Sequence, residues 1–270
     1  MTRPGHAHFV RTDADRYVPA SDEAVRSDWS DDRLLGGAVV GLAAFAVEES
    51  VGHPDYLPAR FTVDLFKTAR KVATTARVDL LRDGRRVRNA VCVLEQEGAP
   101  VARAILVQYR PGEAPRGHEW ASAPDLPAPA GADDAFVQFH SEDVGWNSEI
   151  AEHQNTSRKT VIIRSMNVVA GESNSPFVRA ATAAEAASMV TNLGTAGLGY
   201  INGDLTAGFA RMPQGDWVGV HAESHWTADG IAVGTATLSD TVGAFGSALV
   251  TAVSNAMQQI DYSNRDANRG

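Results

Sequence analysis

The 270-residue chain has a single cysteine, Cys92, so an internal disulfide framework and a zinc ribbon are both excluded. No apolar run approaches the ~20 residues that cross a bilayer, and no membrane span is expected. The N-terminus lacks the apolar segment of a signal peptide, which favours the cytoplasm. The net charge of −9 argues against nucleic acid as a partner. Neither a Gly-x-Ser-x-Gly elbow nor a Walker A motif is present.

The middle of the chain carries the richest run of proline, at residues 111–134, with little apolar periodicity, and this is typical of a linker. At ~150 residues a domain the length alone corresponds to roughly 1.8 domains. We therefore expect an N-terminal domain at 1–112, a linker at 113–134, a C-terminal domain at 135–256 and a polar tail at 257–270.

Each half contains one long run of small and apolar residues that predicts a buried helix, at 34–51 and at 177–193. Ser30 or Asp31 is a candidate N-cap for the first helix. Ser175 is the candidate cap for the second, with a proline in the first turn.

Strand-like runs separated by turn signals follow both helices. They predict an antiparallel meander of four strands in each half, with hairpin turns such as Asp83-Gly84 and Asp229-Gly230. The expected strands are 58–67, 72–82, 86–95 and 100–110, then 200–211, 217–227, 231–239 and 246–253.

The two halves correspond at a nearly constant offset. Thr62 matches Thr206, and Lys67 matches Arg211, both 144 residues apart (206 − 62 and 211 − 67). A constant offset across strands and turns indicates a tandem duplication.

Four segments carry a family resemblance. Leu35-Gly36-Gly37-Ala38 opens the first helix, and 61–67 reads Phe-Thr-Val-Asp-Leu-Phe-Lys. In the second half, 200–206 reads Tyr-Ile-Asn-Gly-Asp-Leu-Thr, and 211–217 reads Arg-Met-Pro-Gln-Gly-Asp-Trp. Together they resemble the double-hotdog acyl-CoA thioesterases of the type II family. The resemblance implies an α+β fold of two tandem hotdogs, each a long helix wrapped by an antiparallel sheet. It also implies hydrolysis of acyl-CoA or a related acyl thioester without a cofactor, and we expect a homodimer.

The resemblance points to Asp204 as the group that orients or deprotonates the attacking water, a role that suits a carboxylate beside an apolar cleft. Thr206 and His225 are expected to shape the polar site. The chain departs from the family pattern twice, because His225 stands at the hydroxyl position and Val250 at or near the glutamine position.

The N-terminus of the first helix is the expected binding site for the thioester carbonyl. Backbone N–H groups at Gly36 and Gly37 suit a developing negative charge, although close packing also favours glycine. Asn202 is a further candidate for substrate binding. Arg60 is the first-half equivalent of Asp204, so it cannot replace that base and is either structural or a contact for CoA phosphates.

His221, Glu223 and His225 alternate along one expected strand and form a His-x-Glu-x-His pattern. A solvated strand face is favoured over a metal site, and no metal is expected. Two other functions stay open: a non-hydrolytic acyl-CoA or apolar-ligand binder, suggested by Val250, and an enoyl-thioester hydratase or dehydratase using Asp204 with His225.

Overall fold

The computed structural model describes residues 7–122, 124–127 and 135–264. The first half contains α1 (Gly36–Val51) and the strands β1 (Ala7–Asp13), β2 (Arg16–Pro19), β3 (Leu57–Leu65), β4 (Thr74–Asp83), β5 (Val87–Gln96) and β6 (Ala99–Tyr109). The second half opens with β7 (Val137–Ser141), β8 (Gly145–Asn147), the 3-10 turn η1 (Ile150–His153), β9 (Lys159–Ile163) and β10 (Asn167–Val169).

Two helices follow, α2 (Pro176–Ala184) and α3 (Ala187–Asn192). The remaining strands are β11 (Leu193–Gly194), β12 (Gly197–Leu198), β13 (Tyr200–Asn202), β14 (Asp204–Phe209), β15 (Val218–Ala228), β16 (Ile231–Asp240) and β17 (Gly243–Ser254), and the short 3-10 turns η2 (Ala256–Gln258) and η3 (Tyr262–Asn264) follow.

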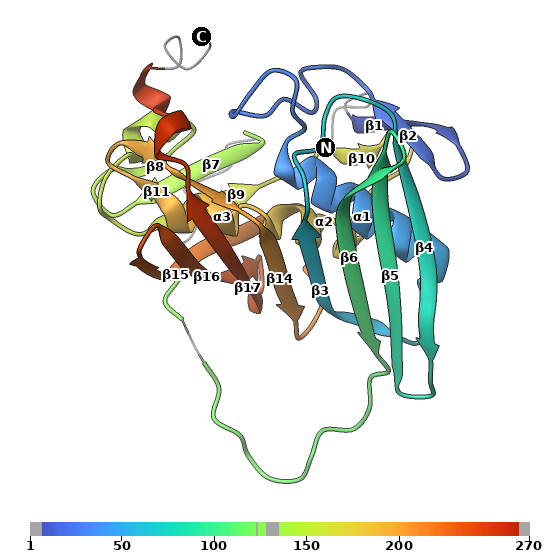
Figure 1. Ribbon diagram of the computed structural model, residues 1–270. Helices are drawn as coiled ribbons and strands as arrows, with labels where there is room; N and C mark the ends of the chain where they lie inside the picture. The colour runs from blue at the N-terminus through green and yellow to red at the C-terminus, as the bar shows by residue number, and fades with distance from the viewer. Residues whose placement is uncertain (1–6, 123, 128–134, 265–270) are drawn as a thin grey trace.

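Within the described residues, one sheet of fifteen strands runs through both halves. Its order is β10-β1-β2-β4-β5-β6-β3-β14-β17-β16-β15-β9-β7-β8, with β13 paired to β17. Figure 1 shows β4, β5, β6, β3, β14 and β17 crossing the front of the molecule, with the helices behind them. Helix α1 packs on β4, β5 and β6, α3 packs on β15, β16 and β17, and α1 crosses α2.

The sheet joins the two halves at β3 and β14, which pair antiparallel. Thr62 lies opposite Thr206 at the centre of this pairing. Two residues to either side, Arg60 faces Gly208 and Asp64 faces Asp204, so the two strands pair symmetrically about the threonines. Strand β10 makes a second connection, because it pairs parallel with β1 through Phe9 and Val169.

All four strands predicted after each helix are present, with ends shifted by up to three residues and the 200–211 run divided into β13 and β14. Their alternation explains this success, since β5 alternates residue by residue between half-buried and buried side chains. The described parts of the predicted linker, 113–122 and 124–127, contain neither helix nor strand. The rest of the linker and residues 265–270 of the predicted tail lie outside the described residues.

The first predicted helix is confirmed, but its predicted caps are wrong. Helix α1 begins at Gly36, its N-cap is Leu35, and no side chain caps it. Ser30 donates to the Asp32 carboxylate instead, at 2.6 Å. The chain is extended before the helix, where Leu34 N–H bonds to the Ala69 carbonyl and Leu35 N–H to the Val25 carbonyl, both at 2.8 Å.

The second predicted helix is broken in two. Ser175 caps α2 as predicted, accepting from Val178 N–H at 3.1 Å. The helix then stops at Ala184, and Ala186 N–H reaches back three residues to the Ala183 carbonyl at 3.0 Å. The interruption at Glu185 and Ala186 lies in an alanine-rich run with no glycine or proline, so local propensity predicts an unbroken helix there.

The main core lies between the helices and the sheet. Phe61 and Phe177 meet edge to face there, with ring centroids 5.4 Å apart. Cys92 is fully buried in this core, and burial raises its pKa to about 12, so it is an inert core residue. Ile260 and Tyr262, from the predicted polar tail, are buried in a smaller second cluster. No helix among the described residues combines the length and hydrophobicity needed to cross a membrane.

Candidate functional site

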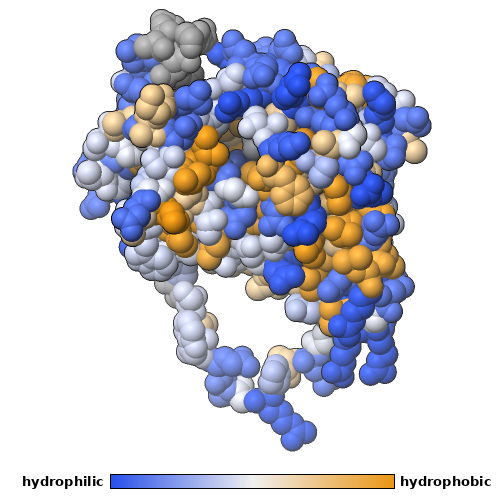
Figure 2. Space-filling view, viewed as in Figure 1, coloured by the Kyte–Doolittle hydropathy of each residue, from blue (hydrophilic) through white to orange (hydrophobic). Residues whose placement is uncertain are grey.

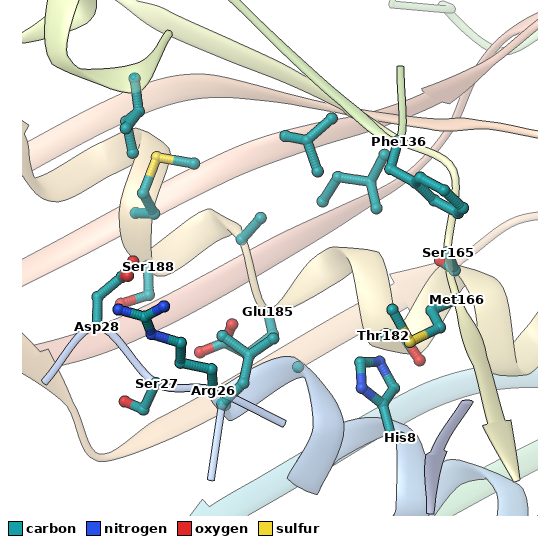
Figure 3. A pocket seen from close by; sticks show the side chains of 18 of the residues that line it. His8, Arg26, Ser27, Asp28, Phe136, Ser165, Met166, Thr182, Glu185 and Ser188 are labelled. Atoms are coloured by element: carbon teal, nitrogen blue, oxygen red, sulfur yellow. The ribbon is translucent and has the colours of Figure 1, made fainter. Parts of the chain in front are cut away.

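A cavity of about 430 Å³ lies where the N-terminus of α1 meets the break between α2 and α3. Its apolar wall includes Phe136, Phe139, Ile163, Met166 and Met189. Its polar lining includes His8, Arg26, Asp28, Thr182, Glu185 and Asn202. Figure 3 shows these two kinds of side chain facing the same space. A mainly apolar cavity with a few converging polar groups is the usual form of a ligand site.

The first turn of α1 forms one end of this cavity. Ala38 and Val39 both donate their N–H groups to the Leu35 carbonyl, at 3.0 and 3.2 Å. The amides of Gly36 and Gly37 donate to no acceptor in the part of the chain that the structure describes. Free amides at a helix N-terminus form a site for a negatively charged oxygen.

Glu185 lies against this helix N-terminus. Its carboxylate fills the space beside Gly36, so that a Cβ atom there would collide with it. Burial raises the pKa of Glu185 from 4.5 to about 7, and a hydrogen bond with the Asn202 side chain acts in the opposite direction. A carboxyl group that titrates near neutral pH can accept and return a proton at physiological pH.

His8 is a titratable residue on the cavity wall, as Glu185 is, and in the view of Figure 3 its ring lies near Thr182. Its Nδ1 lies 2.5 Å from the Ala24 carbonyl oxygen, so Nδ1 carries the proton and donates. Burial lowers the pKa of His8, which keeps the imidazole neutral.

Three predicted site residues therefore line the cavity: Gly36, Gly37 and Asn202. The other four, Arg60, Asp204, Thr206 and His225, are not among its lining residues. On β14, Leu205 and Ala207 are fully buried toward the helices, so the alternating Asp204 and Thr206 lie on the outer face of the sheet. Asp204 Oδ1 accepts there from the Thr251 amide at 2.7 Å and from its hydroxyl at 2.9 Å.

The structure does not bring Asp204 and His225 together. Their strands, β14 and β15, are separated by β17 and β16, which corresponds to roughly 14 Å across the sheet. Burial lowers the pKa of His225, whose ring meets Tyr200 at 6.1 Å between centroids. Thr206 faces Thr62, with 3.4 Å between their hydroxyl oxygens. Arg60 is exposed on β3.

The expected alternation of His221, Glu223 and His225 fails because β15 has an irregularity between Ala222 and Ser224. His221 is buried, with its Nε2 2.6 Å from the Ser239 hydroxyl, whereas Glu223 and His225 are exposed. Trp226, which strict alternation with His225 would point toward the core, is 65% exposed. Among the described residues no cluster of three His, Cys, Asp or Glu side chains suits a metal ion.

Sequence reasoning missed Glu185. The signal was present, because Glu185 and Arg179 are the charged residues in the otherwise small and apolar run 177–193. A carboxylate in a helix that is buried on most sides needs a reason, and functional sites are one.

Comparison with protein families gives two matches in chain order. Residues 25–109 match the acyl-CoA thioesterase N-terminal domain, and residues 111–249 match the acyl-CoA thioesterase C-terminal domain. The second match alone spans more than half of the chain. No match was found among curated protein sequences.

Solved structures show the fold. A proposed thioesterase II from Thermobifida fusca superposes with a TM-score of 0.68 at 17% identity, covering 94% of this chain and 98% of its own. A TesB protein from Mycobacterium avium subspecies paratuberculosis gives 0.66 at 14%, covering 91% and 95%. A conserved hotdog-fold protein from Alicyclobacillus acidocaldarius gives 0.64 at 14%, covering 92% and 96%. The fold is thus of the hotdog type, and the two domain matches together show that the chain belongs to the acyl-CoA thioesterase family.

Proposed function

We propose that the chain hydrolyses acyl-CoA or a related acyl thioester, with the acyl group in the cavity and the carbonyl at the N-terminus of α1. The observation that carries this proposal is the pair of free amides at Gly36 and Gly37, which open onto a cavity with apolar walls. They can stabilise the oxyanion that forms when water attacks the carbonyl. Membership of the acyl-CoA thioesterase family supports the same reaction.

The fold proposed for this reaction is a tandem pair of hotdogs, at 1–112 and 135–256, joined by a linker and followed by a tail at 257–270. The symmetric register about Thr62 and Thr206 supports it, because two repeats related by a 144-residue offset would pair β3 with β14 in this way. Strand order supports it too, since β3, β6, β5 and β4 are mirrored by β14, β17, β16 and β15.

Two carboxylates are candidates for the base. The family resemblance proposes Asp204, with Thr206 and His225 completing a polar site and Arg60 beside it. The cavity itself contains Glu185. If Asp204 is the base, water is activated on the outer face of the sheet, where its carboxylate is already bonded to Thr251. Asp204→Asn with an unchanged rate of thiol release would reject Asp204.

The test of the reaction is the release of free CoA from acyl-CoA substrates of increasing chain length. Hydrolysis requires thiol release above the enzyme-free rate. Saturable acyl-CoA binding without thiol release would instead favour a protein that binds acyl-CoA without hydrolysing it.

Hydration of an enoyl thioester is the second candidate reaction. One observation favours it: the cavity holds an imidazole, His8, as well as the carboxyl group of Glu185, and hydration needs an acid and a base. Conversion of an enoyl thioester to its 3-hydroxy form without thiol release would decide for hydration.

We also propose a homodimer. The outer face of the sheet carries exposed apolar side chains, among them Trp226, Ile231 and Val253, and Figure 2 shows apolar patches on this face. Ile231 and Val253 are direct cross-strand neighbours, so they form one continuous apolar surface. Light scattering during size exclusion should give twice the 28.7 kDa chain mass, and Ile231→Glu should shift it toward the monomer.

A further inference from the structure

Each long helical run places one glutamate against the N-terminus of the other. Glu185, at the break after α2, lies against Gly36, the first residue of α1. Glu48, near the end of α1, accepts from the hydroxyl of Ser175, the N-cap of α2, at 2.5 Å. The molecule thus contains two similar pairings of a carboxylate with a helix N-terminus.

In the pairing of Glu48 with the N-terminus of α2, the polar groups are already used within the protein. Ser175 donates to Glu48 and accepts from Val178 N–H, and Pro176 has no N–H to offer a ligand. Neither Glu48 nor Ser175 is a lining residue of the cavity. The Glu48 carboxylate therefore has a structural role, since its Oε2 accepts the hydrogen bond from the N-cap Ser175.

In the pairing of Glu185 with the N-terminus of α1, polar groups remain available to a ligand. No side chain caps α1, two of its amides lack an acceptor within the described residues, and Glu185 lines the cavity. Figure 3 shows the Glu185 side chain among the polar residues that line the cavity. A water molecule beside this carboxylate would lie close to a carbonyl bound at Gly36 and Gly37.

We propose that Glu185 is the catalytic base that takes a proton from the attacking water. This assignment rests on the proposed thioester hydrolysis. The water oxygen bonds to the carbonyl carbon while its proton moves to the Glu185 carboxylate. The carbonyl electron pair moves onto oxygen, which accepts hydrogen bonds from Gly36 and Gly37. The C–S bond then breaks, the thiolate leaves, and Glu185 returns the proton to sulfur. The products are a carboxylic acid and a thiol.

The surroundings suit this role at neutral pH. Burial brings the pKa of Glu185 to about 7, so both protonation states are populated there. Six other titratable or charged side chains line the same cavity: His8, Glu23, Arg26, Asp28, Arg164 and Tyr262. Burial lowers the pKa of His8, so an acidic limb near pH 7 in the rate profile would belong to Glu185.

The experiment compares Glu185→Gln with Glu48→Gln in the full chain. Thiol release is measured over pH 5.5–8.5, and binding is measured with a non-hydrolysable thioether analogue of an acyl-CoA that the wild type cleaves. Thermal melting establishes that both variants fold.

Glu185→Gln should lose about 100-fold or more in kcat, which is typical for loss of a general base, and should bind the analogue within about threefold of wild type. Glu48→Gln should keep both the rate and the acidic limb. An active wild type with Glu185→Gln within threefold of its kcat would overturn the role of Glu185 alone. A folded Glu185→Gln that loses analogue binding in proportion to rate would also overturn it. A wild type without thiol release on any chain length would instead reject the hydrolysis on which the role rests.

Discussion

The carboxylate of Glu185 occupies the space that a side chain at Gly36 would need. This contact explains why the first residue of α1 is a glycine, whereas no such contact restricts the second residue, Gly37. A Cβ atom on Gly37 would lie 3.6 Å from the Thr182 carbonyl oxygen, which is an ordinary contact. Only Gly36 is needed to leave room for the acid in the cavity.

Gly36→Ala should therefore destabilise the fold by up to about 1 kcal/mol, because the end of the Glu185 side chain must move away from the added methyl group. Gly37→Ala should be neutral or stabilising by up to about 1 kcal/mol, since alanine favours helix. Urea unfolding of the two variants gives the comparison. Equal losses would show that the collision with Glu185 is not what constrains position 36.

The raised pKa of Glu185 also predicts the pH dependence of stability. Its pKa is about 7 in the folded chain, against 4.5 in the unfolded chain, so folding favours the protonated form. Below pH 4.5 the Glu185 carboxyl is neutral in both the folded and the unfolded chain, so it does not lower the free energy of unfolding. Between 4.5 and 7 the free energy of unfolding falls as pH rises, and above 7 the cost levels off at about 3 kcal/mol, an upper estimate.

Glu185→Gln should remove this slope. The difference in unfolding free energy between the variant and the wild type should move in the variant's favour by about 2–3 kcal/mol from pH 4.5 to pH 8. Urea titrations at several pH values measure it, and all other groups cancel in the comparison. Parallel profiles for the two proteins would show that Glu185 titrates normally.

Strand alternation made the meanders predictable, and the same alternation predicts the face on which each side chain of β14 lies. Leu205 and Ala207 are apolar and flank Thr206, so the sequence indicates that Asp204 and Thr206 face away from the core. The irregularity in β15, by contrast, has no local signal and reversed the orientation of Trp226.

The break between α2 and α3 was not predictable for a similar reason. Nothing in 183–187, Ala-Ala-Glu-Ala-Ala, disfavours a helix, so the interruption must come from packing against the rest of the molecule. Glu185 and Ala186 form this break and line the cavity, so the part of the candidate site that could be predicted was Gly36, Gly37 and Asn202.

Arg211 and Asp240 explain part of the motif at 211–217. The Asp240 carboxylate is buried and accepts from the Arg211 guanidinium at 2.5 and 2.9 Å and from Gln214 N–H at 2.6 Å. Burial alone would raise the pKa of Asp240, but these donors outweigh burial and lower it. Its contribution to stability is therefore present at neutral pH and is lost as pH falls through the lowered pKa.

Asp240→Asn should cost about 3 kcal/mol, because it leaves the Arg211 guanidinium without its ion-pair partner. Asp216→Asn is the matched control, since Asp216 is 68% exposed and pairs with Arg164 at 3.4 Å. That change should cost less than about 1 kcal/mol. Chemical unfolding at pH 7 separates the two, and a loss at Asp240 no larger than at Asp216 would contradict the structural role given to the Arg211 pair.

The connections between the halves predict how the molecule responds to cleavage within residues 113–122, between β6 and β7. Residues 113–122 contain neither helix nor strand, and they can accept a protease site without breaking a sheet hydrogen bond. Contacts outside this segment hold the halves together, among them the pairing of β3 with β14, the pairing of β1 with β10, and the packing of α1 against α2.

After cleavage the two fragments should co-elute in size exclusion and melt together, with a single transition close to that of the intact chain. Thiol release should be preserved, because the cavity draws residues such as Gly36 from one fragment and Glu185 from the other. For the same reason, separating the fragments in mild urea should abolish the activity, and mixing them should restore it. Fragments that separate freely in buffer would show that the continuous sheet is too weak to join the two halves. Activity in either isolated fragment would place the site within one half.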